Sequence, residues 1–375
     1  MRKFIFIFLF FTIHIVNAQD SLNFIISNRV IFKEDTVKRE VFELYKNYFY
    51  SHPDSIYDNP YWNRNEKDRY YRFDLSISSI YNGVDFETLK KYFNFYVLSI
   101  EKYDINKYTL RVLIQVKGGL SNGSSVWCIH KVSAIKENAN WVLQNNIVKE
   151  TSKWESYKIG VINYHYSPYY NFNEALANEA NSFIDTIATN LNISKNINVD
   201  YYLAEDVDEL GMLIGFDYFF TGITSGLACL KDDYIMSTNG EFHAYETVHI
   251  MLKSKYSRNF MIEEGLAEFL GTKKQFPKKY RISLSKLTND VLHSDGYTIE
   301  NLLAQKAPYK GYNYKYPFGA ILCELVYEEK GFDGIKELAF SDTKTESDLI
   351  KVLSNIIEVK QEKLQEIILN YIELF

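Results

Sequence analysis

Hydrophobic and polar positions divide the chain into a strand-rich first part and a helix-rich last part. Between residues 95 and 147, apolar and polar residues alternate as in strands with one buried face. The predicted strands span residues 95–100, 108–116, 125–134 and 141–147. An apolar stripe at helical spacing predicts a helix over residues 36–50, and residues 85–92 add a further helical turn or two. This pattern predicts an antiparallel sheet with a helix on its apolar face.

A second pattern begins near residue 154, where short strands and helices mix before helices take over. The predicted strands are 159–164, 197–203, 226–230 and 234–237, and the predicted helices are 173–191 and 206–212. Later apolar stripes predict a helix that ends at Gly331, as glycine-capped helices do, and two more over 349–356 and 364–371.

We therefore expect an α+β protein with two domains, residues 19–152 and 153–375, the second with a small mixed sheet and a mainly helical C-terminal half. The first domain resembles the cone-shaped nuclear-transport-factor-like or cystatin-like α+β fold over about residues 30–150. That resemblance implies a domain that binds or assembles rather than one that catalyses.

The first residues have the pattern of a secretory signal peptide. Arg2 and Lys3 precede an apolar run over residues 4–16, and a small residue, Ala18, follows. The run is too short to span a bilayer, and no later run is long enough. We expect residues 1–18 to be removed and the protein to be exported to the periplasm or the exterior, with no transmembrane segment.

The charge balance argues against nucleic acid as a partner. The 42 basic and 48 acidic residues give a net charge of −6, and loss of Arg2 and Lys3 makes the mature chain more acidic.

Residues 240–272 hold the candidate chemistry, on two predicted helices. Glu246 and His249 share the first helix, and Glu264 and Glu268 lie four residues apart on one side of the second. A histidine and a glutamate that two antiparallel helices bring together are two potential ligands of a metal site.

This stretch resembles the gluzincin, or peptidase MA-like, zinc metallopeptidases of the thermolysin and aminopeptidase type, and the likeness extends over about residues 155–375. Residues 245–249, Tyr-Glu-Thr-Val-His, match His-Glu-x-x-His except at the first position, and residues 264–269 match the Glu motif of the second helix. The resemblance implies that His249 and Glu264 are zinc ligands and that Glu246 is the general base. It also implies that Glu268 orients the first ligand, whose place Tyr245 takes.

Three interpretations of Tyr245 are open. The phenol is itself the third ligand, if the metal removes its proton. His243 replaces it, which requires the helix to begin after His243. Alternatively, Tyr245 fills the ligand volume with its hydroxyl bonded to Glu268, and no zinc is tightly bound. Apart from the resemblance, a plainer alternative is that Tyr245 and His249 are a core aromatic and a hydrogen-bonded histidine.

Two further features follow from the resemblance. In these peptidases an edge strand binds the substrate backbone, for which Gly226 and Ala228 are the candidates here, although an ordinary strand entered through a glycine turn fits equally. Tyr316, or else Tyr314, is the candidate to hydrogen-bond the oxyanion at a helix start, the alternative being an aromatic packed beside Pro317.

The sequence leads to three hypotheses about function. The first is an exported peptidase homologue with a degenerate zinc site that binds a peptide or protein without cutting it. The second is an active zinc peptidase with an atypical third ligand, in which Glu246 deprotonates the attacking water and Tyr316 stabilises the oxyanion. The third is a protein that acts through a partner of its N-terminal domain.

Overall fold

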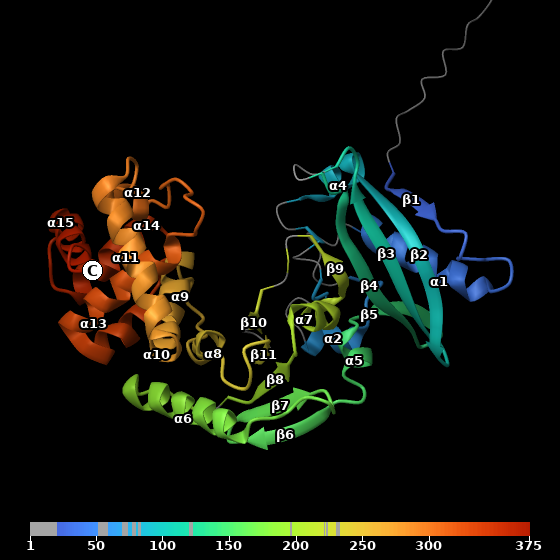
Figure 1. Ribbon diagram of the computed structural model, residues 1–375, viewed down its shortest axis with the longest axis horizontal. Coiled ribbons are helices and arrows are strands. Elements are labelled where there is room, and N and C mark those ends of the chain that lie inside the picture. Colours follow the sequence, from blue (N-terminus) through green and yellow to red (C-terminus); the bar gives the residue numbers. More distant parts are fainter. Residues whose placement is uncertain are drawn as a thin grey trace, which may run out of the picture. The chain divides into compact units, whose positions relative to one another are not determined.

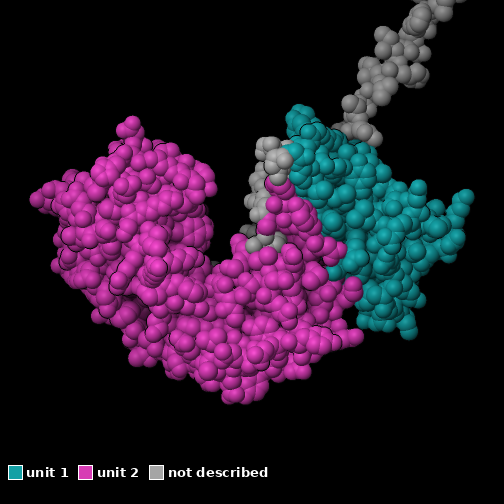
Figure 2. Space-filling model, viewed as in Figure 1, with its two compact units in different colours: residues 1–61, 76–143 teal, residues 62–75, 144–375 magenta. Residues whose placement is uncertain are grey.

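The computed structural model describes residues 21–51, 59–69, 74–76, 80–81, 84–119, 123–195, 197–220, 222, 224–229 and 233–375. The chain forms two compact units, the first within residues 1–61 and 76–143 and the second within 62–75 and 144–375 (Figure 2). We predicted a boundary at residue 152; the contacts place it at 143 and assign residues 62–75 to the second unit. The predicted signal peptide lies outside the described residues, and so does residue 230, the last residue of the predicted strand 226–230.

The first unit is a sheet of strands in the order β1-β2-β3-β4-β5 (Figure 1). Its strands are β1 (Asn23–Ile26), β2 (Phe93–Asp104), β3 (Lys107–Val116), β4 (Val126–Glu137) and β5 (Asn140–Gln144). Consecutive strands β2, β3 and β4 are antiparallel, which confirms the predicted meander, whereas β1 adds in parallel to β2. Its helices are α1 (Thr36–Tyr50) and α4 (Phe86–Tyr92).

Helix α1 forms where its apolar stripe predicts it. Asp35 caps its first turn by accepting hydrogen bonds from the backbone N–H groups of Val37 and Lys38. The stripe is buried, and the ring of Phe49 lies 5.2 Å from that of Phe95 on β2. Burial of such aromatic side chains supplies most of the stability of a helix this short.

The second unit contains a mixed five-stranded sheet in the order β10-β11-β8-β7-β6. Its strands are β6 (Glu155–Ile159), β7 (Ile162–Tyr166), β8 (Val199–Leu203), β10 (Gly226–Cys229) and β11 (Tyr234–Ser237). The pairs β7/β8 and β8/β11 are parallel, while β6/β7 and β10/β11 are antiparallel. Helix α6 (Glu174–Asn190) packs on one face, where Tyr164 and Tyr201 are buried (Figure 1).

One predicted strand of this sheet was wrong. Residues 159–164 were predicted as a single strand, but the chain reverses at Gly160 and forms the hairpin of β6 and β7. Gly160 has a φ of 55°, a conformation that glycine adopts without steric cost. The apolar pattern continues through the turn, which concealed it.

The rest of the second unit is mainly helical, so the chain has the predicted α+β fold. The shorter elements are α2 (Arg64–Arg69), α5 (Ile147–Glu150), α7 (Val207–Ile214) and β9 (Phe216–Phe219). The C-terminal half comprises α8 (Ala244–Met251), α9 (Phe260–Ala267), the π-helix η1 (Glu268–Thr272), α10 (Lys273–Gln275), α11 (Pro277–His293), α12 (Ile299–Leu303), α13 (Lys315–Ala339), α14 (Glu346–Ile356) and α15 (Gln361–Ile372). The predicted stop at Gly331 is a kink in α13, where φ is 59°.

Two glycines fix the helix crossing behind the candidate site. Gly265 on α9 and Gly319 on α13 face each other so closely that a Cβ on either would overlap the backbone of the other helix. Direct backbone contact of this kind holds α9 against α13 and therefore sets the direction of its side chains. Among the described residues, no helix combines the length and hydrophobicity needed to cross a membrane.

Candidate functional site

The motif residues surround one cavity of about 540 Å³ in the second unit. Strand β10, helices α8 and α9 and the π-helix η1 each contribute to its lining, and Tyr316 comes from the start of α13. His249 and Glu264 both line this cavity, as the sequence analysis expected. Tyr245, Glu246, Glu268, Gly226 and Ala228 do so as well.

Helix α8 begins at Ala244, so that His243 is its N-cap residue. His243 could be a ligand only if the helix began after it, and this condition is met. The ring of His243, however, lies 2.9 Å from the hydroxyl of Ser237 and 3.1 Å from the amide of Asn239. Burial lowers the pKa of His243 to about 4. These neighbours hold the ring at the β11 side of the cavity.

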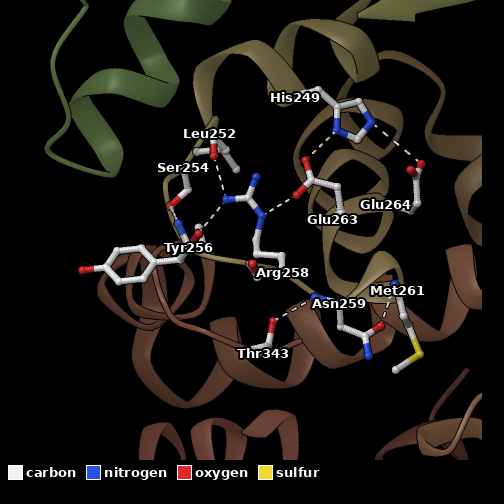
Figure 3. A network of polar contacts seen from close by, with 12 residues as sticks. His249, Leu252, Ser254, Tyr256, Arg258, Asn259, Met261, Glu263, Glu264 and Thr343 are labelled. Atoms are coloured by element: carbon white, nitrogen blue, oxygen red, sulfur yellow. Dashed lines mark hydrogen bonds and ion pairs between the residues drawn. The ribbon is translucent and has the colours of Figure 1, made fainter. Parts of the chain in front are cut away.

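His249 is placed between two carboxylates of α9 (Figure 3). Its Nδ1 atom lies 3.1 Å from Oε1 of Glu263, and its Nε2 atom lies 3.8 Å from Oε2 of Glu264. Although burial disfavours a charged imidazole, the carboxylates of Glu263, Glu246 and Glu264 raise the pKa of His249. Glu263 therefore orients the ring, and Nε2 faces the carboxylate of Glu264.

Arg258 holds Glu263 in that position. Its Nε atom forms an ion pair with Glu263, while its NH1 group donates to the backbone carbonyls of Leu252 and Ala339 at 2.7 Å each. Figure 3 shows this guanidinium between the end of α8 and the start of α9. Despite burial, the hydrogen bonds from His249 and Arg258 lower the pKa of Glu263 to about 2.

Tyr245 donates a hydrogen bond from its hydroxyl to Oε2 of Glu264. We expected Glu268 as its partner, whereas the side chain of Glu268 accepts a hydrogen bond from Thr272. Gly271 of η1 packs against the backbone of Tyr245, and the phenol hydroxyl meets Glu264 of α9 instead. Burial, with the charge of Glu264 next in importance, raises the pKa of the phenol.

Tyr316 and Tyr245 stand side by side in the cavity. Their rings are nearly parallel, at an interplanar angle of 17° and a centroid distance of 6.5 Å. Burial raises the pKa of Tyr316 to about 12, so its hydroxyl is protonated and able to donate. Tyr314, the second candidate, is buried against the ring of Tyr297 at 5.9 Å. Of the two oxyanion candidates, Tyr314 and Tyr316, it is Tyr316 that lines the cavity.

Glu246 lies against the edge strand of the sheet. It accepts a hydrogen bond from the backbone N–H of Ala228, and burial raises its pKa to about 7. A Cβ at Gly226 would overlap the ring of His243 and approach Oε1 of Glu246 to 2.9 Å. The absence of a side chain at this position therefore lets β10 approach the cavity floor.

The residues present do not complete a three-ligand zinc centre. His249 and Glu264 converge. The position of the third ligand is taken by the protonated phenol of Tyr245, which is hydrogen-bonded to Glu264. Catalytic zinc sites hold the metal with three protein ligands, commonly histidine or carboxylate side chains. Within the described part of the chain, no three His, Cys, Asp or Glu side chains form a metal-binding group.

Sequence reasoning missed two residues of the site, Glu263 and Arg258. The adjacent pair Glu263 and Glu264 was visible in the sequence, but the rotation of α9 decides which carboxylate meets which ring nitrogen. Arg258 carries no pattern of its own, since it lies in the connection between the two helices. No protein-family model matches the chain, and a search of the curated proteins found no match to its sequence.

Proposed function

We propose that the second unit binds an extended peptide segment, from a peptide or a protein, along β10 and over the floor formed by Tyr245, Glu246, His249 and Glu264, without cutting it. The observation that carries the proposal is the hydrogen bond from Tyr245 to Glu264. It occupies the carboxylate oxygen that faces His249 and so favours binding over metal-dependent hydrolysis.

Strand β10 supports a backbone-mediated mode of binding. It ends the strand order of its sheet, and no described strand pairs with its outer edge. Such an edge presents backbone N–H and C=O groups that an extended peptide can pair with.

A peptide-library screen with the purified protein tests this proposal. Gly226→Val should abolish the binding of selected peptides, because its side chain would collide with His243 and Glu246. Leu227→Ala, the matched control on the same strand, should retain most of the affinity. Mass spectrometry of the incubated peptides should show them intact. Equal affinity in Gly226→Val and wild type would refute this mode of binding.

A zinc peptidase is the second candidate function, because Glu246 lines the same cavity as His249 and Glu264. A carboxyl group with a pKa of about 7 is suited to accept and return a proton near neutral pH. If the protein hydrolyses peptides, Glu246→Gln should abolish hydrolysis and leave the fold unchanged. Hydrolysis that survives this substitution would exclude Glu246 as the proton acceptor.

A further inference from the structure

A second cavity of the second unit, of about 420 Å³, is lined by helix α6, the π-helix η1, helix α10 and helix α13 (Figure 1). The π-helix contributes different residues to this cavity and to the candidate functional site. Glu268 and Thr272 line the candidate functional site, whereas Phe269 and Leu270 line the second cavity. The two cavities have no described lining residue in common. A ligand of the second cavity would therefore bind at a separate site.

Aromatic rings form one wall of this cavity. The rings of Phe269 and Tyr327 lie 5.5 Å apart, and those of Tyr327 and Phe332 lie 5.0 Å apart. Residues five apart on a regular helix point about 140° away from each other, so Tyr327 and Phe332 of α13 meet because the helix is kinked at Gly331. The φ of 59° and ψ of −150° at Gly331 are a conformation that essentially glycine alone adopts. This glycine therefore makes the aromatic wall possible.

Helix α6 lines the cavity with one stripe of residues. Phe183 and Ile187 are buried apolar residues of this stripe, and Ser182 and Thr186 are exposed beside them. The hydroxyls of Ser182 and Thr186 both donate to backbone carbonyls of α6 itself, at 2.9 Å. The cavity thus offers mainly apolar surface, and its volume lies in the range of small-molecule sites, about 300–1,000 Å³.

The charges at this cavity favour an anion. The ammonium of Lys273 lies 4.8 Å from the centre of the Phe269 ring, so a cation placed against this ring would meet like charge. Lys273 is itself paired with Glu324, at 2.8 Å. The side chain of Lys274 is exposed and has no ion pair or hydrogen bond with any residue that the structure describes. Glu179 is the acidic residue among the described lining, against two lysines.

We propose that this cavity binds a small carboxylate with an apolar body, of the class of a medium-chain carboxylic acid. The apolar body lies against the aromatic wall and Ile187, where it leaves water. The carboxylate pairs with the ammonium of Lys274, which has no partner of its own among the described residues.

Calorimetric titration of the purified protein with octanoate, octan-1-ol and octylamine tests the proposal. The three probes share one alkyl chain and differ in the charge of the head group. Octanoate should bind most tightly, the neutral alcohol more weakly and the cationic amine most weakly. No binding of octanoate at millimolar concentration, or binding of octylamine as tight as that of octanoate, would overturn the proposal.

Charge variants test the position of the carboxylate. Lys274→Met should weaken octanoate binding about tenfold and leave octan-1-ol binding unchanged, because only the anion loses its partner. Lys278→Met removes an exposed lysine of α11 that does not line the cavity, and it is the matched control. Glu179→Gln should tighten octanoate binding, a gain that a damaged fold cannot produce. Equal effects of Lys274→Met and Lys278→Met would place the carboxylate elsewhere and contradict the proposal.

A filling variant tests the position of the apolar body. Ser182→Trp places a large side chain in the cavity from an exposed position of α6, so it should abolish the binding of both octanoate and octan-1-ol. His249→Ala should leave both affinities unchanged, because His249 lines the other cavity. Thermal unfolding checks that both variants are folded. Octanoate binding that survives Ser182→Trp, or that is lost in a folded His249→Ala protein, would show that the ligand binds elsewhere.

Discussion

The hydroxyl of Tyr245 is hydrogen-bonded to the carboxylate of Glu264, on the oxygen that His249 Nε2 also faces. The two side chains with ligand chemistry therefore converge as they would around a metal. The phenol of Tyr245 takes the position of the third ligand. Burial raises the pKa of this phenol, which keeps it a hydrogen-bond donor and opposes its conversion to a metal ligand.

Replacement of Tyr245 by histidine should restore a third ligand. We expect Tyr245→His to raise zinc affinity by orders of magnitude, since Glu264 is released from the phenol and His249 is already oriented by Glu263. Competitive titration against a chromogenic chelator measures the change. Tyr245→Phe is the control: it also frees Glu264 but adds no ligand, so its affinity should stay far below that of Tyr245→His. An equally large gain in Tyr245→Phe would contradict this explanation.

The ion pair of Arg258 and Glu263 should contribute strongly to stability. The Arg258 side chain is only 4% exposed, and Arg258→Met leaves Glu263 without its arginine partner, so we expect a loss of about 3–5 kcal/mol in the free energy of unfolding. Lys330→Met, in the exposed ion pair with Glu358, should change stability little. Urea unfolding measures both variants, and equal effects would argue against the structural role of Arg258.

The crossing of α9 and α13 depends on Gly319. A Cβ there would overlap the carbonyl oxygen of Met261, so Gly319→Ala should destabilise the second unit by about 1–3 kcal/mol and weaken peptide binding. Glu329→Ala, at an exposed position of the same helix, is the control. Thermal unfolding and peptide titration check the pair. A Gly319→Ala protein as stable as the control would show that the helices can separate without cost.

The pH dependence of stability should reflect His130 in the first unit. Its ring is buried between the hydroxyls of Tyr45 and Ser76, at 2.9 Å and 3.0 Å, and burial lowers its pKa to about 3. The unfolded chain binds a proton near pH 6.5 while the folded chain does not. The stability due to neutral His130 is therefore complete above pH 6.5 and falls as the pH drops toward 3.

Between pH 7.5 and 5.5, His130 should account for a loss of about 1.4 kcal/mol. Urea unfolding at both pH values, with His130→Gln as the variant that cannot titrate, isolates this contribution. The variant should lose less stability on acidification than the wild type. Equal losses would mean that His130 takes up a proton in the folded state.

Periodicity predicted the elements that local pattern determines. Helix α1 and the strands β2 to β4 lie where alternation and the helical stripe place them, because each buries one face against its own unit. The hairpin at Gly160 was missed because the apolar pattern runs through the turn. Its signal was the glycine itself.

The site was only partly predictable for a different reason. The expectation that His249 and Glu264 meet came from the resemblance of residues 245–249 and 264–269 to the two gluzincin motifs, and both side chains line one cavity. The partners of Tyr245 and His249 depend on how α9 is rotated, which the contact between Gly265 and Gly319 sets across 54 residues of sequence. No local pattern contains that rotation, so Glu268 was chosen where the structure uses Glu264.

The zinc content of the purified wild-type protein decides whether His249 and Glu264 hold a metal. After incubation with equimolar zinc and removal of the free metal, elemental analysis gives the number of zinc ions per chain. We predict well under one, because the phenol of Tyr245 holds Glu264 and leaves the donor set incomplete. One firmly held zinc per chain that is lost in His249→Ala would contradict the account.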